Sequence, residues 1–210
     1  TRNMFYTRKC GEIEPSDFGS EQTLCGWLQD IRNLGGIAFI QLRDISGVIQ
    51  LTLLKKKLDE KKFKNWTNIN RESVVLVRGI VKENKEAPGG VEMLPDNIEL
   101  LNEAETPLPL GVIDKIDSEI ETRLNARYMD LRKKDIAAHF QIRAAVSGAV
   151  HKHLRREKFL EVQTPKIIAS ATEGGTSLFE MKYFDRTAYL AQSPQLYKQI
   201  LMGGGLERVY

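Results

Sequence analysis

The 210-residue sequence predicts an α+β protein in two parts: a small five-stranded β-barrel, and then a domain of helices and strands. Three observations lead to this prediction. Short runs of alternating apolar and polar residues occupy residues 20–101 and are separated by glycine-containing turns. A charged, proline-containing stretch follows them. After it comes a long helical pattern that runs into a strand-like segment stopped by Pro165.

The barrel prediction depends on alternation along the expected strands. Residues 37–44 place three apolar side chains on one face and a mixed set on the other: Ala38, Ile40 and Leu42 against Phe39, Gln41 and Arg43. Further strands are expected at Val48–Leu54, Ser73–Val81 and Val91–Leu101. The charged segment Lys55–Asn68 is expected to be helical. Five short strands with a helix after the third predict an OB-type Greek-key barrel.

The expected domain boundary lies between residues 102 and 132. Pro107, Leu108 and Pro109 form a stiff connector, and Asp114–Glu121 is strongly charged. We therefore divide the chain into a barrel domain at residues 1–104, a hinge or linker at 105–132, and the start of a second domain at 133–210.

The second part is predicted to contain a long helix and then a strand. Asp135 is expected to be the N-cap residue of this helix. One face of the helix is apolar and is formed by Ile136, Phe140, Val146, Val150 and Leu154. Phe159–Thr164 is expected to be a strand that ends at Pro165. Another helix is expected to begin near Pro194.

Composition and charge narrow the class of protein without giving its function. The net charge of +3 is compatible with a nucleic-acid partner but does not require one. The apolar runs are too short to span a bilayer, and the first residues lack the apolar core of a secretory signal. Cys10 and Cys25 form no disulfide framework or metal-ligand pattern, so we expect reduced thiols in a cytoplasmic protein. Six lysines between residues 55 and 64 fit a solvated helix face or RNA contact equally well.

Several local motifs together resemble one family. Phe159–Pro165 is similar to motif 1 of the class II aminoacyl-tRNA synthetases. Ala171–Gly175 resembles the mobile loop that closes over the amino acid in aspartyl members, and Gln192–Gln199 resembles their substrate-binding turn. The hinge and barrel also match, at Thr122–Arg127, Asp130–Arg132, Gly26-Trp27 and Arg43-Asp44. The resemblance spans nearly the whole chain and is closest to aspartyl-tRNA synthetases of the archaeal and eukaryotic type, in class IIb.

This resemblance implies a fold, co-substrates and an assembly. Residues 133–210 would be the N-terminal portion of a class II catalytic domain built on an antiparallel sheet, here truncated. Motif 1 would form a homodimer interface, with Pro165 close to the partner's active site. ATP would be the co-substrate and Mg²⁺ the metal, with the arginines of motifs 2 and 3 and the metal ligands expected beyond Tyr210. We therefore assign no catalytic side chain and no metal ligand within the chain, and expect these 210 residues alone to be inactive.

Four residues are implied to bind aspartate. Lys198 would meet the side-chain carboxylate, because burying that charge without a cation is costly. Glu173 on the closing loop would face the α-ammonium group, and Ser193 and Gln195 would accept hydrogen bonds from it. By position alone, Lys198 could be a surface lysine on a helix and Glu173 a solvated loop acid.

The mixed face of the barrel is implied to read the tRNA anticodon. Phe39 would stack on a splayed base, and Gln50 would read the Watson–Crick edge of that base. Arg32 and Glu92 are expected to be further readers. A shift of one residue in strand register would instead turn Phe39 into the core.

Strict reading of the third anticodon base is expected to depend on two other positions. Family members confined to the aspartate anticodon commonly carry a Trp two positions after the tryptophan of the Gly-Trp pair, and a Lys in the loop before the last barrel strand. Here these positions hold Gln29 and Pro88. Gln29 can both donate and accept hydrogen bonds, and Pro88 offers neither charge nor an N–H donor. We therefore expect the tRNA for asparagine to be charged as well, unless Arg32 or Glu92 restores strict reading.

Three functions remain open from the sequence. The first is an aspartate–tRNA ligase, which makes aspartyl-adenylate from ATP and transfers the amino acid to tRNA. The second is a related class IIb ligase for asparagine or lysine. Lys198 argues against asparagine, since a neutral amide cannot offset the desolvation of a cation, and a lysine site would need acidic residues. The third is a non-catalytic tRNA-binding fragment.

Overall fold

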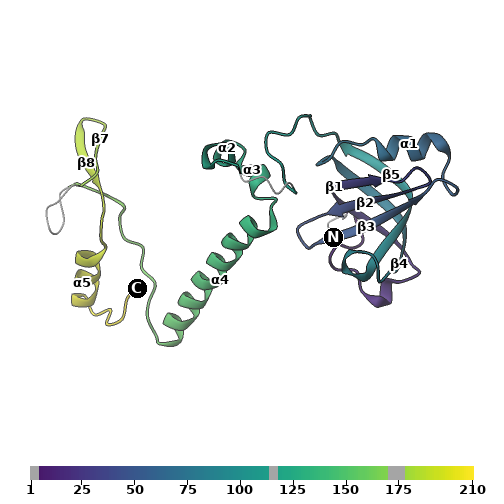
Figure 1. The fold of residues 1–210 in the computed structure, drawn as a ribbon. Helices are drawn as coiled ribbons and strands as arrows, with labels where there is room; N and C mark the ends of the chain where they lie inside the picture. Colours follow the sequence, from purple (N-terminus) through teal and green to yellow (C-terminus); the bar gives the residue numbers. More distant parts are fainter. Residues whose placement is uncertain (1–4, 114–117, 170–177) are drawn as a thin grey trace. The chain divides into compact units, whose positions relative to one another are not determined.

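The computed structural model describes residues 5–113, 118–169 and 178–210 (Figure 1). Contacts within the chain divide it into two compact units, residues 1–133 and residues 134–210, and each is described by itself. The finer division expected from the sequence, with a separate linker at 105–132, stays a prediction.

The first unit is built on a closed barrel with the strand order β1-β2-β3-β5-β4. Its strands are β1 Glu21–Asn33, β2 Ile37–Arg43, β3 Val48–Leu54, β4 Val74–Glu83 and β5 Val91–Asn102. The pairing of β3 with β5 is parallel and the other pairings are antiparallel, and β1 closes the ring against β4. The helix α1, Glu60–Thr67, comes between β3 and β4 in the chain. The predicted five-stranded OB-type barrel with a helix after the third strand is confirmed.

The alternation predicted along β2 and β3 is also confirmed. The inward residues are at most 1% exposed and form the core of the barrel: Ala38, Ile40, Leu42, Ile49, Leu51 and Leu53. Phe39 and Gln50 have the opposite parity and are only partly buried. The alternative register with Phe39 in the core is therefore wrong, and the mixed polar and aromatic side of both strands lies on the outside of the barrel.

Two glycines allow neighbouring strands to approach closely. A Cβ atom at Gly26 would collide with the carbonyl oxygen of Arg43 on β2, and one at Gly79 with the carbonyl oxygen of Leu94 on β5. Only a residue without a side chain fits such contacts between backbones. Gly26 of the Gly-Trp pair is thus required by the geometry of the barrel wall.

The connector after the barrel contains two short helices that the sequence did not predict, α2 Ile120–Asn125 and α3 Arg127–Asp130. The Asp130 side chain is fully buried, and its carboxylate pairs with Arg123 at 3.1 Å and with Arg127. Burial alone would raise the pKa of Asp130, but the hydrogen bond and charge of Arg123, with the nearby cations, hold it below its ordinary value. This segment folds largely around a buried carboxylate, so it shows little apolar periodicity.

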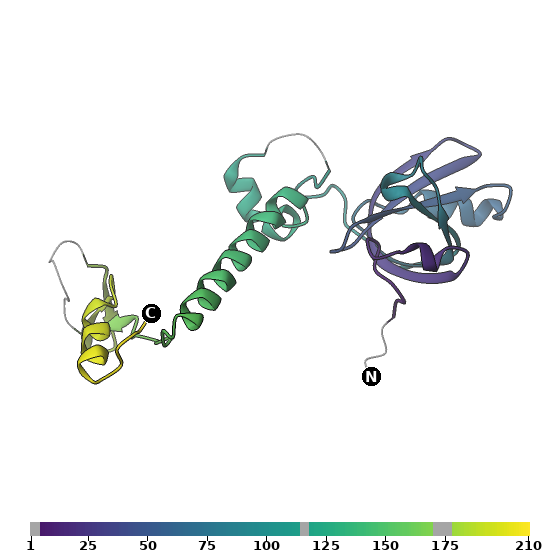
Figure 2. The same cartoon turned by 90° about the horizontal axis from the view of Figure 1, so that it is seen from below.

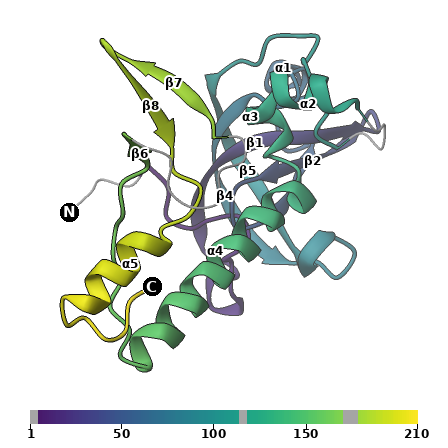
Figure 3. The same cartoon turned by 90° about the vertical axis from the view of Figure 1, so that its left-hand side faces the viewer.

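The second unit begins with the helix α4, Lys134–Arg156, seen along its length in Figure 2. A small antiparallel sheet follows in the order β6-β8-β7, and then the helix α5, Gln195–Gly203 (Figure 3). Its strands are β6 Ile167–Ile168, β7 Glu180–Tyr183 and β8 Arg186–Leu190. The expected N-cap at Asp135 is wrong because the helix already begins at Lys134. Asp135 lies in the first turn, where a carboxylate favours the positive end of the helix dipole.

The expected strand at Phe159–Thr164 is also wrong. The segment forms only an isolated parallel bridge, between Leu160 and Val209. Backbone hydrogen bonds of 2.8–3.1 Å join Leu160 and Val162 to residues 208–210. The pairing is too short to make a strand, and Pro165 supplies no N–H donor to extend it.

The apolar face predicted for α4 is partly exposed, with Ile136 and Leu154 partly buried. Phe140, Val146 and Val150 are 47%, 57% and 50% exposed, and the described structure buries no residue of this helix. The apolar pattern of α4 is therefore not explained by packing within the described residues. None of the described helices is both long and apolar enough to cross a membrane.

Candidate functional site

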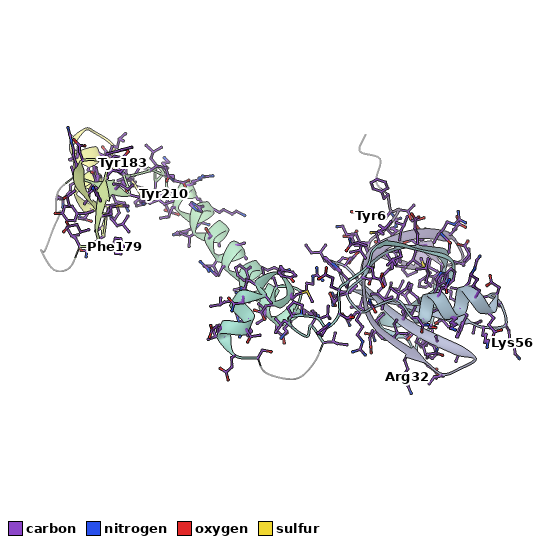
Figure 4. All side chains as sticks on the ribbon, turned by 90° about the horizontal axis from the view of Figure 1, so that it is seen from above. Tyr6, Arg32, Lys56, Phe179, Tyr183 and Tyr210 are labelled. Atoms are coloured by element: carbon purple, nitrogen blue, oxygen red, sulfur yellow. The ribbon has the colours of Figure 1, made fainter. Side chains whose placement is uncertain are left out.

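The candidate nucleic-acid face lies on the outside of β1, β2 and β3. In the strand register Phe39 stands opposite Arg32 of β1 and opposite Thr52 of β3. Arg32 is exposed and projects away from the barrel (Figure 4). Gln41 follows Phe39 on the same face and stands opposite Gln50. An aromatic ring, a guanidinium group and two amides thus share one open surface, which could stack a base and bond its edge.

Glu92 closes one side of this face. Its carboxylate lies 2.8 Å from the ammonium group of Lys82, and it accepts hydrogen bonds from the Thr52 hydroxyl and, at 2.9 Å, from the Asn84 amide. The Gln50 amide nitrogen lies 3.5 Å from the same carboxylate. Burial alone would raise the pKa of Glu92, but the hydrogen bonds from Lys82, Thr52 and Asn84 lower it. Glu92 is therefore ionised at neutral pH and orients Gln50, while its role as a direct reader stays a prediction.

Gln29 lies at an irregularity in β1, where the register against β2 shifts between Leu28 and Asp30. Its side-chain oxygen accepts a hydrogen bond from Arg43 Nη1 at 3.1 Å, and its amide nitrogen donates to Gln41 Oε1 at 2.9 Å. The structure thus brings Gln29 onto the same face as Phe39. The alternation of β1, with Leu24 and Leu28 buried, points Gln29 outward, and the bulge leaves it without a directly paired residue on β2.

Arg43 anchors this side of the face to the connector. It is 8% exposed and donates two hydrogen bonds, of 2.7 and 3.0 Å, to the buried carboxylate of Glu72. Arg132 donates to the same carboxylate at 2.9 Å. The guanidinium carbons of Arg43 and Arg132 lie 5.6 and 4.7 Å from the ring centre of Trp27. The partly buried ring of Trp27 thus packs against two cations on the outer side of the barrel wall.

Pro88 and the lysine cluster lie at other parts of the barrel surface. Pro88 is exposed and begins a short 3-10 turn, Pro88–Gly90, between β4 and β5. The six lysines are all exposed on α1 or just before it, and Lys56 projects outward in Figure 4. Lys55 pairs with Glu60 at 3.0 Å. This arrangement fits a solvated helix face and RNA contact alike, so the question from the sequence stays open.

The candidate amino-acid site belongs to the second unit. The hydroxyl of Ser193 accepts a hydrogen bond from the Gln195 N–H at 3.2 Å, and the Lys198 N–H donates to the Pro194 carbonyl at 3.0 Å. Lys198 is half-buried, and among the described residues no carboxylate lies within ion-pair distance of its ammonium group. Glu173 lies outside the described residues, so its place beside this turn stays a prediction.

Pro165 precedes the sheet of the second unit. It is exposed, two residues before β6. In the described part of the chain no group of three or more His, Cys, Asp or Glu side chains could hold a metal ion.

Two residues of the candidate nucleic-acid face, Gln41 and Arg43, have no role predicted from the sequence. Gln41 and Arg43 had been assigned to the mixed side of β2 without a function. Polar outward residues beside Phe39 were the available signal for Gln41. Arg43 depends on Glu72, and only the folded barrel brings together two residues 29 apart in the chain.

Two family models match the chain. A model described as tRNA synthetases class II (D, K and N) matches residues 119–210, and a model described as an OB-fold nucleic acid binding domain matches residues 22–101. Together they cover the barrel, the two connector helices and the second unit.

Individual relatives match at higher identity. The chain is 51% identical to the aspartate–tRNA(Asp/Asn) ligase of Methanopyrus kandleri, over 95% of the chain and 46% of that protein. It is 48% identical to the aspartate–tRNA(Asp) ligase of Thermococcus kodakarensis, over 99% of the chain and 47% of that protein. The chain thus spans about half the length of these relatives.

Among solved structures, the asparaginyl-tRNA synthetase of Pyrococcus horikoshii with asparaginyl-adenylate superposes with a TM-score of 0.87 at 31% identity. That match covers 98% of this chain and 47% of the other. The aspartyl-tRNA synthetase of Entamoeba histolytica gives a TM-score of 0.76 at 27% identity, over 96% of this chain and 43% of the other.

Proposed function

Because the chain is a homologue of archaeal-type aspartyl-tRNA synthetases, joining their OB-fold domain to the start of their class II domain, we propose that it belongs to an aspartate–tRNA ligase. The full-length protein would use ATP and Mg²⁺ to convert aspartate into aspartyl-adenylate and would then transfer the amino acid to tRNA. The described residues would bind the anticodon and hold the amino acid. A cytoplasmic location is part of the proposal, since that is where tRNA is charged.

The proposal that aspartate is the amino acid rests on the surroundings of Lys198. A half-buried ammonium group with no carboxylate near it in the described residues leaves a place for the charge of a ligand. An aspartate side chain supplies that charge, an asparagine amide does not, and a lysine ammonium would be repelled. A site built for a charged partner can reject the neutral analogue by roughly 10⁴-fold.

The test is amino-acid-dependent pyrophosphate exchange by the full-length protein. Aspartate should support the exchange, while asparagine and lysine should not. Exchange with asparagine or lysine, and not with aspartate, would instead favour a different class IIb ligase. The absence of exchange with all three would leave a tRNA-binding protein without this activity.

We propose that both tRNA(Asp) and tRNA(Asn) are charged. The relatives include ligases of either description at nearly equal identity, so overall similarity does not decide the question. Gln29 and Pro88 support the relaxed form, because neither provides a bulky ring or a cation beside the third anticodon base. In addition, the side-chain oxygen of Gln29 already accepts a hydrogen bond from Arg43, so it is not free to select a base.

We expect two transcripts that differ only in cytosine or uracil at that anticodon position to be aspartylated at similar rates. Gln29→Trp combined with Pro88→Lys should restore a preference for cytosine. Charging rates of both transcripts with the original and the double variant give the measurement. A preference above roughly 100-fold in the original protein, about 2.7 kcal/mol, would refute relaxed reading.

We also propose that the full-length protein is a homodimer in which α4 is covered. The exposed side chains of Val146 and Val150 support this, because exposed apolar side chains on a long helix are commonly buried by a partner. Sedimentation of the full-length protein should show a dimer, and Val146→Glu with Val150→Glu should shift it toward monomer. A monomer at all concentrations of the unsubstituted protein would contradict the proposal.

A further inference from the structure

Three side chains on the outside of β1 and β2 form a directed row of hydrogen bonds. Arg43 Nη1 lies 3.1 Å from Gln29 Oε1, and Gln29 Nε2 lies 2.9 Å from Gln41 Oε1. A guanidinium group can only donate, so it must meet the oxygen of Gln29. The amide nitrogen of Gln29 therefore faces Gln41 and must meet an oxygen there. The direction of the whole row follows from Arg43.

Arg43 itself is held firmly. Its other terminal nitrogen makes two hydrogen bonds, of 2.7 and 3.0 Å, with the buried carboxylate of Glu72, which also accepts from Arg132. Reorienting the Arg43 guanidinium would leave a buried carboxylate with too few donors, which is costly. The row thus begins at a fixed donor.

The row ends at the amide nitrogen of Gln41. Its oxygen is occupied by Gln29, and within the described part of the chain no acceptor lies within hydrogen-bond distance of its nitrogen. Gln41 is half-buried and lies two residues from Phe39 on the same face of β2, a spacing of about 7 Å. A base stacked on Phe39, or the base next to it, would bring a polar edge within reach of this donor.

We propose that Gln41 is a further RNA-contacting residue that donates a hydrogen bond to an anticodon base, and that Arg43 is the positioning residue that fixes its amide through Gln29. This inference rests on the proposed tRNA-binding function and adds a contact to it. An N–H donor recognises a carbonyl oxygen or a ring-nitrogen acceptor, and cytosine and uracil both carry such acceptors. The contact therefore adds affinity for the RNA without selecting between cytosine and uracil.

The test measures binding of the full-length protein to an anticodon stem-loop RNA carrying the aspartate anticodon. Gln41→Leu should weaken binding by about five- to tenfold, the effect of one lost hydrogen bond. Abasic substitution at each anticodon position then identifies the base, because removal of that base should weaken RNA binding more in the original protein than in Gln41→Leu, which has already lost one contact to it. Asn97→Leu, an exposed amide on β5, is the matched control and should bind as the original.

A double-mutant cycle tests the positioning role. In Gln29→Glu a carboxylate still accepts from Arg43, but its second oxygen would force Gln41 to turn its amide and present an oxygen to the RNA. The added negative charge repels RNA in every background, so only the difference between backgrounds reports the turned amide. Gln29→Glu should weaken binding about fivefold more in the original protein than in Gln41→Leu.

The outcomes separate this inference from the proposed function. If the original protein discriminates anticodon bases but Gln41→Leu binds as well as it does, Gln41 makes no contact and the inference fails alone. Equal effects of Gln29→Glu in both backgrounds would remove the positioning role of Arg43. Stem-loop binding that does not depend on any anticodon base would overturn the proposed function together with the inference. Unchanged thermal unfolding of each variant excludes a general loss of the fold.

Discussion

Lys198→Ala in the full-length protein is expected to raise the aspartate concentration needed for half-maximal pyrophosphate exchange by roughly 100-fold or more. Removing one partner of a desolvated charge pair costs about 2–5 kcal/mol, and about 2.7 kcal/mol corresponds to 100-fold. The requirement for ATP should change little, because Lys198 is proposed to touch only the side chain of aspartate. Exchange assays with aspartate and ATP varied separately give the two values.

Two further variants sharpen this test. Lys64→Ala removes an exposed lysine from α1 in the barrel and should leave exchange unchanged, since the exchange reaction needs no tRNA. Lys198→Arg keeps the charge but changes the shape, so it should recover part of the lost affinity. If Lys198→Ala activates aspartate within a few-fold of the original protein, the carboxylate has another partner.

Glu72→Gln is expected to lower the free energy of unfolding of the barrel by about 3–5 kcal/mol. The substitution leaves the buried guanidinium of Arg43 without its counter-charge, which costs far more than the loss of an exposed ion pair. Glutamine keeps the length of the side chain at a residue whose φ is 66°, so the change acts mainly through charge. Both tryptophans of the 210-residue chain, Trp27 and Trp66, lie in the barrel unit, and their fluorescence during urea unfolding follows this unit alone.

Two further variants test whether the loss of unfolding free energy increases with the burial of the charged group. Glu83→Gln changes an exposed carboxylate at the end of β4 and should alter the free energy of unfolding by less than about 0.5 kcal/mol. Arg132→Gln should cost an intermediate amount, because its side chain is 22% exposed and Glu72 keeps Arg43 as a partner. A loss below about 1 kcal/mol for Glu72→Gln would show that water or another group replaces the ion pair.

The barrel was predictable because its strands bury one face and expose the other. A period of two in residues 37–44 and 48–54 is enough to assign Ala38 and Ile40 to the core and Phe39 to the outside. Glycine-containing turns then separate β1 from β2, β2 from β3 and β4 from β5. The outward placement of Phe39 and Gln50 followed from the same alternation, without any knowledge of neighbouring strands.

The parts that sequence reasoning missed depend on partners distant in the chain. The two connector helices enclose the buried carboxylate of Asp130, and charged residues carry no apolar period that would reveal this. Phe159–Thr164 has the composition of a strand, but its pairing is decided by residues 208–210. The row from Arg43 to Gln41 likewise appears only once β1 and β2 are paired in the folded barrel. Local patterns report burial well and long-range polar pairing poorly.

The two units differ in how many apolar residues they bury, and this difference has a consequence for folding during synthesis. The barrel encloses a continuous apolar core from Leu24 to Ile98, whereas in the described part of the second unit only Ile168 and Ala188 are buried apolar residues. Domains generally fold in the order in which the ribosome releases them. The barrel can therefore be complete while α4 is still emerging from the ribosome. The exposed apolar side chains of α4 then make it a stretch of the nascent chain that chaperones and proteases can recognise.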